Sequence, residues 1–191
     1  EVFANLQRFL PAVKRRVVPD ALFGVGLRLS AQAAEQLDDD ATLEVFEEFL
    51  QREGLYVFTL NGFPHGAFHG TRVKEEVYRP DWLEPERVTY SNRLARLLER
   101  LLPDEGLDFG TISTVPGAFK PRVTSPATVA AMTRQLVEHA SELVAVERRS
   151  GKHLVLALEP EPCCFLETSA ETAKFFAESY SRTGGRTNFY T

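Results

Sequence analysis

Four short apolar runs, each followed by a segment of helical periodicity, constrain the fold of this chain more than any other feature of its sequence. The runs cover residues 22–29, 55–60, 107–115 and 153–158. They are continuous apolar stretches with little alternation, which is typical of strands covered on both faces, as in parallel sheets. The sequence therefore predicts an α/β fold in which strands and helices alternate along the chain.

The predicted helices begin at recognisable capping residues. Asp40 is a predicted cap for the helix after the first strand, and Ser125 followed by Pro126 is a strong start for the helix after the third. Thr168 and Glu171 fit a capping box for the last helix. We expect helices over 41–52, 88–102, from residue 126 onward, and over 169–180.

The links between these elements are unequal in length. Each helix-to-strand link is short and contains a glycine, whereas the strand-to-helix links include 27 residues from Asn61 to Arg87 and ten from Pro116 to Ser125. Long loops without a task are unusual in compact domains. Here they gather at the carboxyl ends of the strands, where α/β folds place their sites.

The length of the chain bears on the closure of the sheet. A closed eight-stranded (β/α)8 barrel takes about 250 residues, whereas this chain has 191 residues and four visible units. We expect a single α/β domain over 1–180 that is about half of such a barrel, followed by an irregular, glycine-rich tail over 181–191. The sequence does not begin with Met, so we expect it to be part of a longer protein.

Composition narrows the classes of partner. The net charge of -5 disfavours a nucleic-acid backbone as partner, because such proteins usually carry the opposite balance. No run of about 20 apolar residues predicts a membrane span. The sequence starts without a signal peptide and has two adjacent cysteines, Cys163 and Cys164, which suit a reducing compartment. We expect a cytoplasmic protein in which both cysteines are small buried residues.

Two histidines follow the second predicted strand. His65 and His69 lie four residues apart among three glycines. Neutral imidazole is a common metal ligand and the usual proton shuttle near neutral pH. The alternative is that both are loop histidines that only make local hydrogen bonds. We favour a functional role because position and composition agree.

Glu159 ends the fourth predicted strand, which is otherwise apolar. A carboxylate at a strand end can bind a divalent cation or act as a general base. We favour Glu159 over Glu161 because it stands at the strand terminus; the alternative is a glutamate that simply faces solvent.

Three further residues are candidates for substrate contact. Asn61 opens the histidine loop, and Trp82 lies later in the same long link, where it could wall a pocket or anchor the loop. Lys120 follows the third strand and offers a cation for a carboxylate or phosphate, although a solvated surface lysine is the commoner case.

Three segments resemble a known family. Residues 61–69 (NGFPHGAFH), 73–82 (VKEEVYRPDW) and 158–162 (LEPEP) are similar to the bacterial metabolite-traffic proteins of the Ebo operon, and the resemblance spans about 23–180. That family is similar in fold to xylose isomerases, sugar-phosphate epimerases and type IV apurinic endonucleases. The endonuclease-like members have a histidine before Pro-Gly after the third strand, where this chain has Val115. We therefore do not expect their trinuclear zinc site.

The resemblance implies a TIM barrel with a divalent metal (Mn, Zn or Mg) at its mouth. By position the metal ligands would be His65 or His69, together with Glu159. We expect a sugar or sugar-phosphate isomerase or epimerase that acts on a small polyhydroxy metabolite, with His65, His69 and Glu159 as catalytic groups. The alternative is a non-catalytic carrier that hands a metabolite to partner proteins of the same operon.

Overall fold

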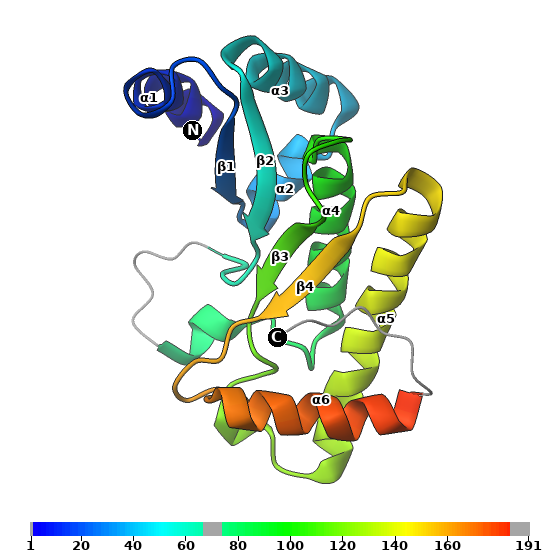
Figure 1. The fold of residues 1–191 in the computed structure, drawn as a ribbon. Helices are drawn as coiled ribbons and strands as arrows, with labels where there is room; N and C mark the ends of the chain where they lie inside the picture. Colours follow the sequence, from blue (N-terminus) through cyan, green and yellow to red (C-terminus); the bar gives the residue numbers. More distant parts are fainter. Residues whose placement is uncertain (1, 67–73, 184–191) are drawn as a thin grey trace.

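The computed structural model describes residues 2–66 and 74–183. Its centre is a sheet of four parallel strands in the order β1-β2-β3-β4: β1 (Phe23–Arg28), β2 (Leu55–Asn61), β3 (Gly110–Thr114) and β4 (Leu154–Leu158). Strand order follows chain order, so every crossover passes from one strand to its neighbour (Figure 1). The predicted alternation of strands and helices is confirmed.

Helices precede, connect and follow the strands. They are α1 (Val2–Val17), α2 (Ala31–Leu37), α3 (Asp40–Glu53), α4 (Pro85–Leu101), α5 (Pro126–Ser150) and α6 (Ser169–Thr183), with short 3-10 helices η1 (Lys74–Tyr78) and η2 (Lys120–Arg122) in the two long links. No helix of the described residues is long and apolar enough to cross a membrane.

The capping predictions are confirmed at two of three helices. Ser125 Oγ accepts a hydrogen bond from the Thr128 amide at the start of α5. At α6, Thr168 Oγ1 accepts from the Glu171 amide, and the Glu171 carboxylate accepts from the Thr168 amide, which is a capping box. At α3 the cap is Asp39 rather than Asp40, because Asp40 already lies in the first turn.

Three other expectations need correction. Helices α1 and α2 were not predicted. Strand β3 is shorter than the apolar run over 107–115, because its ladder with β4 begins only where Gly110 pairs with Leu154. Helix α6 continues to Thr183, beyond the predicted end at residue 180.

The hydrophobic core lies between the sheet and one helix layer. Side chains on one face of the strands pack against α3, α4 and α5. The fully buried core residues include Val57, Leu60, Leu94, Leu98, Ile112 and Leu156. These helices lie on the same side of the sheet (Figure 1). The opposite face of the sheet has no described helix packed along it, and it carries the candidate site.

Candidate functional site at the carboxyl ends of the strands

Three polar residues form a level row across the uncovered face. Arg28 pairs in register with Asn61, and Asn61 with Ser113, at the carboxyl ends of β1, β2 and β3. Register partners in a parallel sheet point to the same face. Arg28 and Asn61 are exposed and Ser113 is half-buried. The register partner of Ser113 on β4 is Ala157. Glu159 lies two residues beyond Ala157, past the carboxyl end of the strand; we call this end of the sheet the mouth.

The amino end of the same face is apolar. Phe58 is 40% exposed, and Leu107 and Phe109 are 37% and 51% exposed. Together with Thr111 they border a hollow of about 420 Å³. The uncovered face is therefore graded from an apolar amino end to a polar carboxyl end, which is the polarity expected of a site at the mouth of parallel strands.

The position of Glu159 agrees with its predicted placement at a strand end. Its amide donates to the Thr114 carbonyl over 3.1 Å, which continues the β3–β4 ladder by one step. Its side chain is exposed. Neighbouring Glu161 is partly covered and accepts a hydrogen bond of 3.4 Å from the hydroxyl of Tyr78. Burial raises the pKa of Tyr78 to about 12, so this hydroxyl keeps its proton at neutral pH.

His65 lies toward β1, at the other side of the mouth. Its ring makes an edge contact with Tyr90 at 5.0 Å between centroids, and its carbonyl accepts from the Ala31 amide at the start of α2. Burial lowers the pKa of His65, with the nearby charge of Arg87 acting in the same direction. The imidazole is therefore neutral at pH 7, the form that binds metals or accepts a proton. His69 lies outside the described residues.

His65 and Glu159 are separated by the strand order. Strands β2 and β4 are two spacings apart, about 10 Å, and His65 turns further away toward α2. Within residues 2–66 and 74–183, no three His, Cys, Asp or Glu side chains gather as a metal would require. The described donors therefore do not fit the predicted divalent cation by themselves, and the ligand set that includes His69 stays a prediction.

Asn61, Trp82 and Lys120 have local roles in the structure. Asn61 Oδ1 accepts from the Phe63 amide over 3.0 Å and so turns the chain after β2. Trp82 is 0% exposed, and its indole N–H donates to the Val115 carbonyl over 3.1 Å, which favours the anchoring interpretation over a pocket wall. The ammonium group of Lys120 forms ion pairs with the carboxylates of Glu167 and Glu171.

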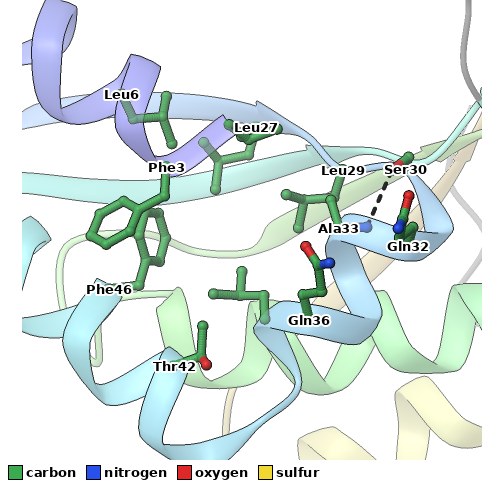
Figure 2. Close-up of a pocket in the computed structure, with 12 residues that line it drawn as sticks. Phe3, Leu6, Leu27, Leu29, Ser30, Gln32, Ala33, Gln36, Thr42 and Phe46 are labelled. Carbon is green, nitrogen blue, oxygen red and sulfur yellow. Dashed lines mark hydrogen bonds between the residues drawn. The ribbon is translucent and has the colours of Figure 1, made fainter.

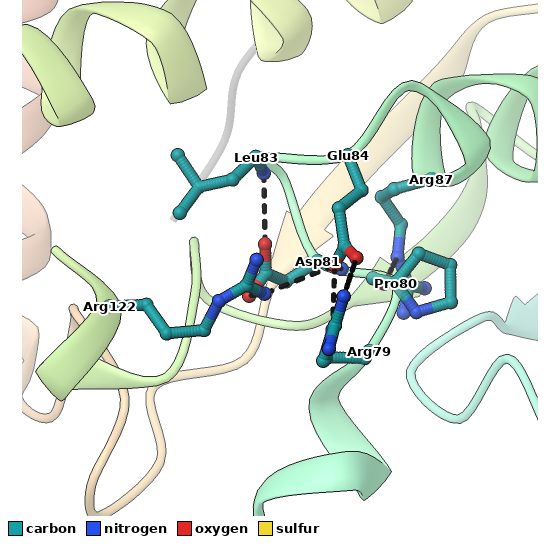
Figure 3. Close-up of polar contacts among 7 residues, drawn as sticks. All are labelled: Arg79, Pro80, Asp81, Leu83, Glu84, Arg87 and Arg122. Atoms are coloured by element: carbon teal, nitrogen blue, oxygen red, sulfur yellow. Dashed lines mark hydrogen bonds and ion pairs between the residues drawn. The ribbon is translucent and has the colours of Figure 1, made fainter.

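A network of charges joins the two long links behind the mouth (Figure 3). Arg122 in η2 forms ion pairs with buried Asp81 and, over 3.0 Å, with Glu84. The Glu84 carboxylate also accepts a hydrogen bond from Arg79. Burial acts to raise the pKa of Glu84, but the hydrogen bonds from Arg79, the Asp81 amide and Arg122 lower it to about 2. The network fixes the loop after β2 to the loop after β3.

Arg87 of α4 binds the backbone of the long link between β2 and α4. It is 0% exposed and donates to the carbonyls of Gly62 and Pro80 over 2.6 Å each and to Phe63 over 3.2 Å. Burial lowers its pKa to about 10, so it remains charged at pH 7. The histidine loop is therefore held by a cation that bonds to its backbone.

The two cysteines differ. Cys164 is 0% exposed, and burial raises its pKa to about 12, as expected for a small buried thiol. Cys163 is exposed, which corrects the prediction for that residue. Its φ of 73° lies in the left-handed region, which non-glycine residues seldom adopt.

A second hollow lies outside the sheet, between α1, β1, α2 and α3. It has a volume of about 280 Å³ and is walled by Phe3, Leu6, Leu27, Leu29 and Phe46. Figure 2 shows Ser30, Gln32, Gln36 and Thr42 around it, with Ser30 bonded to the Ala33 amide as the cap of α2. It borders the helix layer and is separate from the mouth.

Sequence reasoning found part of this site. It placed Glu159 and Asn61 at strand ends but did not name Arg28 and Ser113 as candidates, and these two residues are the register partners of Asn61. The same sequence feature could have identified both: each is a polar residue within the last two positions of a strand.

Comparisons with known proteins support the fold. No family model matches the chain, and no curated protein does. Two similar solved structures are the "probable 3-DHS dehydratase AsbF involved in the petrobactin synthesis" from Bacillus anthracis and a xylose isomerase domain protein from Planctomyces limnophilus. Each has a TM-score of 0.52 and 13% identity; they cover 86% and 89% of this chain but only 50% and 62% of their own.

These likenesses confirm the predicted fold class. The described residues have the α/β fold of about half a TIM barrel, and the chain spans 50% of the length of the first of these proteins and 62% of the second. The four parallel strands with helices on one face are the corresponding part of the barrel.

Proposed function

We propose that the chain forms part of an enzyme of the sugar isomerase or epimerase type, which acts on a small polyhydroxy metabolite at the carboxyl ends of the strands. The observation that carries the proposal is the polar row of Arg28, Asn61 and Ser113 with Glu159 beyond it. Cationic, amide and hydroxyl groups on adjacent strands suit the hydroxyl and carbonyl oxygens of such a ligand. The resemblance to the Ebo metabolite-traffic proteins points to the same ligand class.

Glu159 is the proposed proton-transfer group. Its carboxylate is exposed on the mouth side of the sheet and its backbone is held by the Thr114 carbonyl. A carboxylate in this place can remove a proton from the carbon next to a carbonyl and return it. Arg28 and Asn61 would orient the oxygens of the ligand. The predicted cation would need His69 or further donors in addition to His65 and Glu159.

The test measures proton exchange directly. In D₂O, D-fructose and D-xylose are incubated with the protein, and deuterium at the carbon next to the carbonyl is followed by NMR. We expect exchange with the unchanged protein and a loss of about 10²-fold or more in Glu159→Gln. Glu105→Gln, an exposed glutamate before β3, is the control and should exchange normally. Equal exchange in Glu159→Gln would refute the assignment.

A metabolite carrier without turnover is the second candidate. It is favoured by the spacing of His65 and Glu159 and by the lack of a three-donor group among the described side chains. It predicts binding of the same sugars, seen by saturation-transfer NMR, without deuterium exchange. Calorimetric titration of Mn²⁺ or Zn²⁺ into chelator-treated protein separates the two candidates further. The metal-dependent enzyme predicts heat of binding that is lost in Glu159→Gln, whereas a carrier does not require a metal ion bound at Glu159.

A further inference from the structure

The four strand ends present a graded series of polar groups across the mouth. β1 ends in the guanidinium of Arg28 and β2 in the amide of Asn61, and the hydroxyl-bearing Ser113 of β3 is in register with Asn61. β4 is followed directly by the carboxylate of Glu159. Charges of opposite sign therefore stand at the two outer strands of the sheet, with neutral hydrogen-bonding groups between them.

Arg28 lies on the side of the sheet that carries the candidate site. Its neighbour Leu27 is 4% exposed and belongs to the core beneath the helices, and successive side chains of a strand point to opposite faces. Arg28 is accordingly exposed. Burial raises the pKa of Tyr90 to about 12, and the nearby positive charges of Arg87 and Arg28 act in the opposite direction. The hydroxyl of Tyr90 donates to the carbonyl of Leu29, so the charge of Arg28 stands near the end of β1.

Arg28 and Glu159 are too far apart to neutralise each other. Their strands are three spacings apart, about 14 Å along the sheet, whereas an ion pair needs a nitrogen–oxygen distance within about 4 Å. A ligand that lies across the mouth, over Asn61 and Ser113, can therefore meet the cation with one end and the carboxylate with the other.

This separation of charge orients an acidic ligand. An anionic group is attracted to Arg28 and repelled by Glu159, so it binds at the β1 side of the mouth. The other end of the same ligand then lies toward Glu159, the group proposed to transfer a proton. The guanidinium of an arginine is a planar fork of N–H donors, which matches the two oxygens of a carboxylate.

The donors near Arg28 suit a carboxylate better than a phosphate. Phosphate sites commonly add backbone amides at the start of a helix to their cations. Helix α2, which follows β1, has only seven residues, and amides at its start are already bonded within the protein. The Ala31 amide donates to the His65 carbonyl, and the Ala33 amide donates to Ser30 Oγ.

We propose that the ligand of this mouth is a sugar acid, whose carboxylate binds Arg28 and whose carbonyl end lies toward Glu159. Arg28 is then the residue that selects an acidic sugar over a neutral one. This inference rests on the proposed site at the strand ends. It concerns binding, and it applies to the enzyme and to the carrier alike.

Three aldoses that differ only at carbon 6 test the proposal: D-glucuronate, D-glucose and D-glucose 6-phosphate. Their dissociation constants for the 191-residue chain are measured by protein-observed NMR titration at low ionic strength, where charges are least screened. We expect D-glucuronate to bind at least ~10-fold more tightly than D-glucose, and more tightly than D-glucose 6-phosphate. D-galacturonate and D-galactose form a second pair with the other configuration at carbon 4.

Variants of Arg28 identify the group that causes the preference. Arg28→Met removes the charge and should reduce the preference for the acid over the neutral sugar to less than about 2-fold. Arg28→Lys keeps the charge without the planar fork, so it should retain only part of the preference. Arg134→Met is the matched control, because Arg134 is an exposed arginine of α5, and it should keep the full preference.

Several results would overturn the proposal. They are equal binding of acidic and neutral sugars, tighter binding of D-glucose 6-phosphate, no binding of either acid at roughly 10 mM, and a preference that survives Arg28→Met. Far-UV circular dichroism checks folding. If Arg28→Met does not fold, Arg28→Lys decides, and an unchanged preference in that variant counts against the role of Arg28.

Deuterium exchange at carbon 2 separates this inference from the proposed function. Binding of D-glucuronate that depends on Arg28, without exchange in D₂O, supports the sugar-acid ligand and refutes the isomerase. Exchange of neutral sugars with no preference for the acids supports the isomerase and refutes the sugar-acid ligand.

Discussion

At the scale of single residues, Arg87 holds the backbone of the long link after β2. Replacing it by Met removes three hydrogen bonds and leaves the carbonyls of Gly62, Phe63 and Pro80 without their donor. We expect Arg87→Met to lower the free energy of unfolding by about 3 kcal/mol, measured by urea denaturation. Arg96→Met is the control: Arg96 is 47% exposed and pairs with Asp38, so its loss should cost less than about 1 kcal/mol.

Glu84 predicts how stability depends on pH. Its pKa is about 2 in the folded protein and 4.5 as the ordinary value, so the carboxylate contributes stability above pH 4.5 that is lost as the pH falls through 2. We expect Glu84→Gln to be less stable at pH 6 and to show a flatter fall between pH 4.5 and 2. Glu35→Gln, with 70% exposure, should keep the original slope. Parallel slopes in all three proteins would contradict this role.

At the scale of elements, alanine substitutions at two glycines distinguish the cost of backbone strain from the cost of a steric clash. Gly117 and Gly151 both have positive φ, 91° and 74°. A Cβ at Gly117 would lie 2.8 Å from Met132 Sδ, whereas one at Gly151 meets nothing within 4 Å. We expect Gly151→Ala to cost about 1 kcal/mol from backbone strain and Gly117→Ala to cost a further ~1–3 kcal/mol from overpacking. Denaturant midpoints measure both, and equal losses would show that the packing at Gly117 yields.

The elements also show what the sequence predicts. The strands, α5 and α6 follow from apolar runs and caps, which are local properties. Helix α1 was not predicted because Pro11 interrupts its pattern and several of its apolar side chains, Phe9 and Val17 among them, are exposed. Helix α2 has only seven residues, too few for a periodic signal. The third strand begins at Gly110, later than predicted, because its pairing with β4 begins there, and this pairing is not a local property.

At the scale of the whole molecule, the site combines both kinds of information. The placement of Glu159 and Asn61 at strand ends could be predicted from the apolar runs that precede them. The row that includes Arg28 and Ser113 depends on register between strands far apart in sequence. The burial of Trp82 and the ion pairs of Lys120 depend on how two long links fold together, which neither composition nor periodicity describes.

The contrast between the two adjacent cysteines has a practical consequence. Thiol-directed dyes need an accessible sulfur, and of this pair only Cys163 is exposed, while Cys164 is enclosed and stays protonated. A maleimide fluorophore should therefore attach at a single position, on the loop that follows β4. Because that loop begins at Glu159, a change in the emission of the label on adding a sugar would test whether the sugar binds at the carboxyl ends of the strands, without any engineered cysteine.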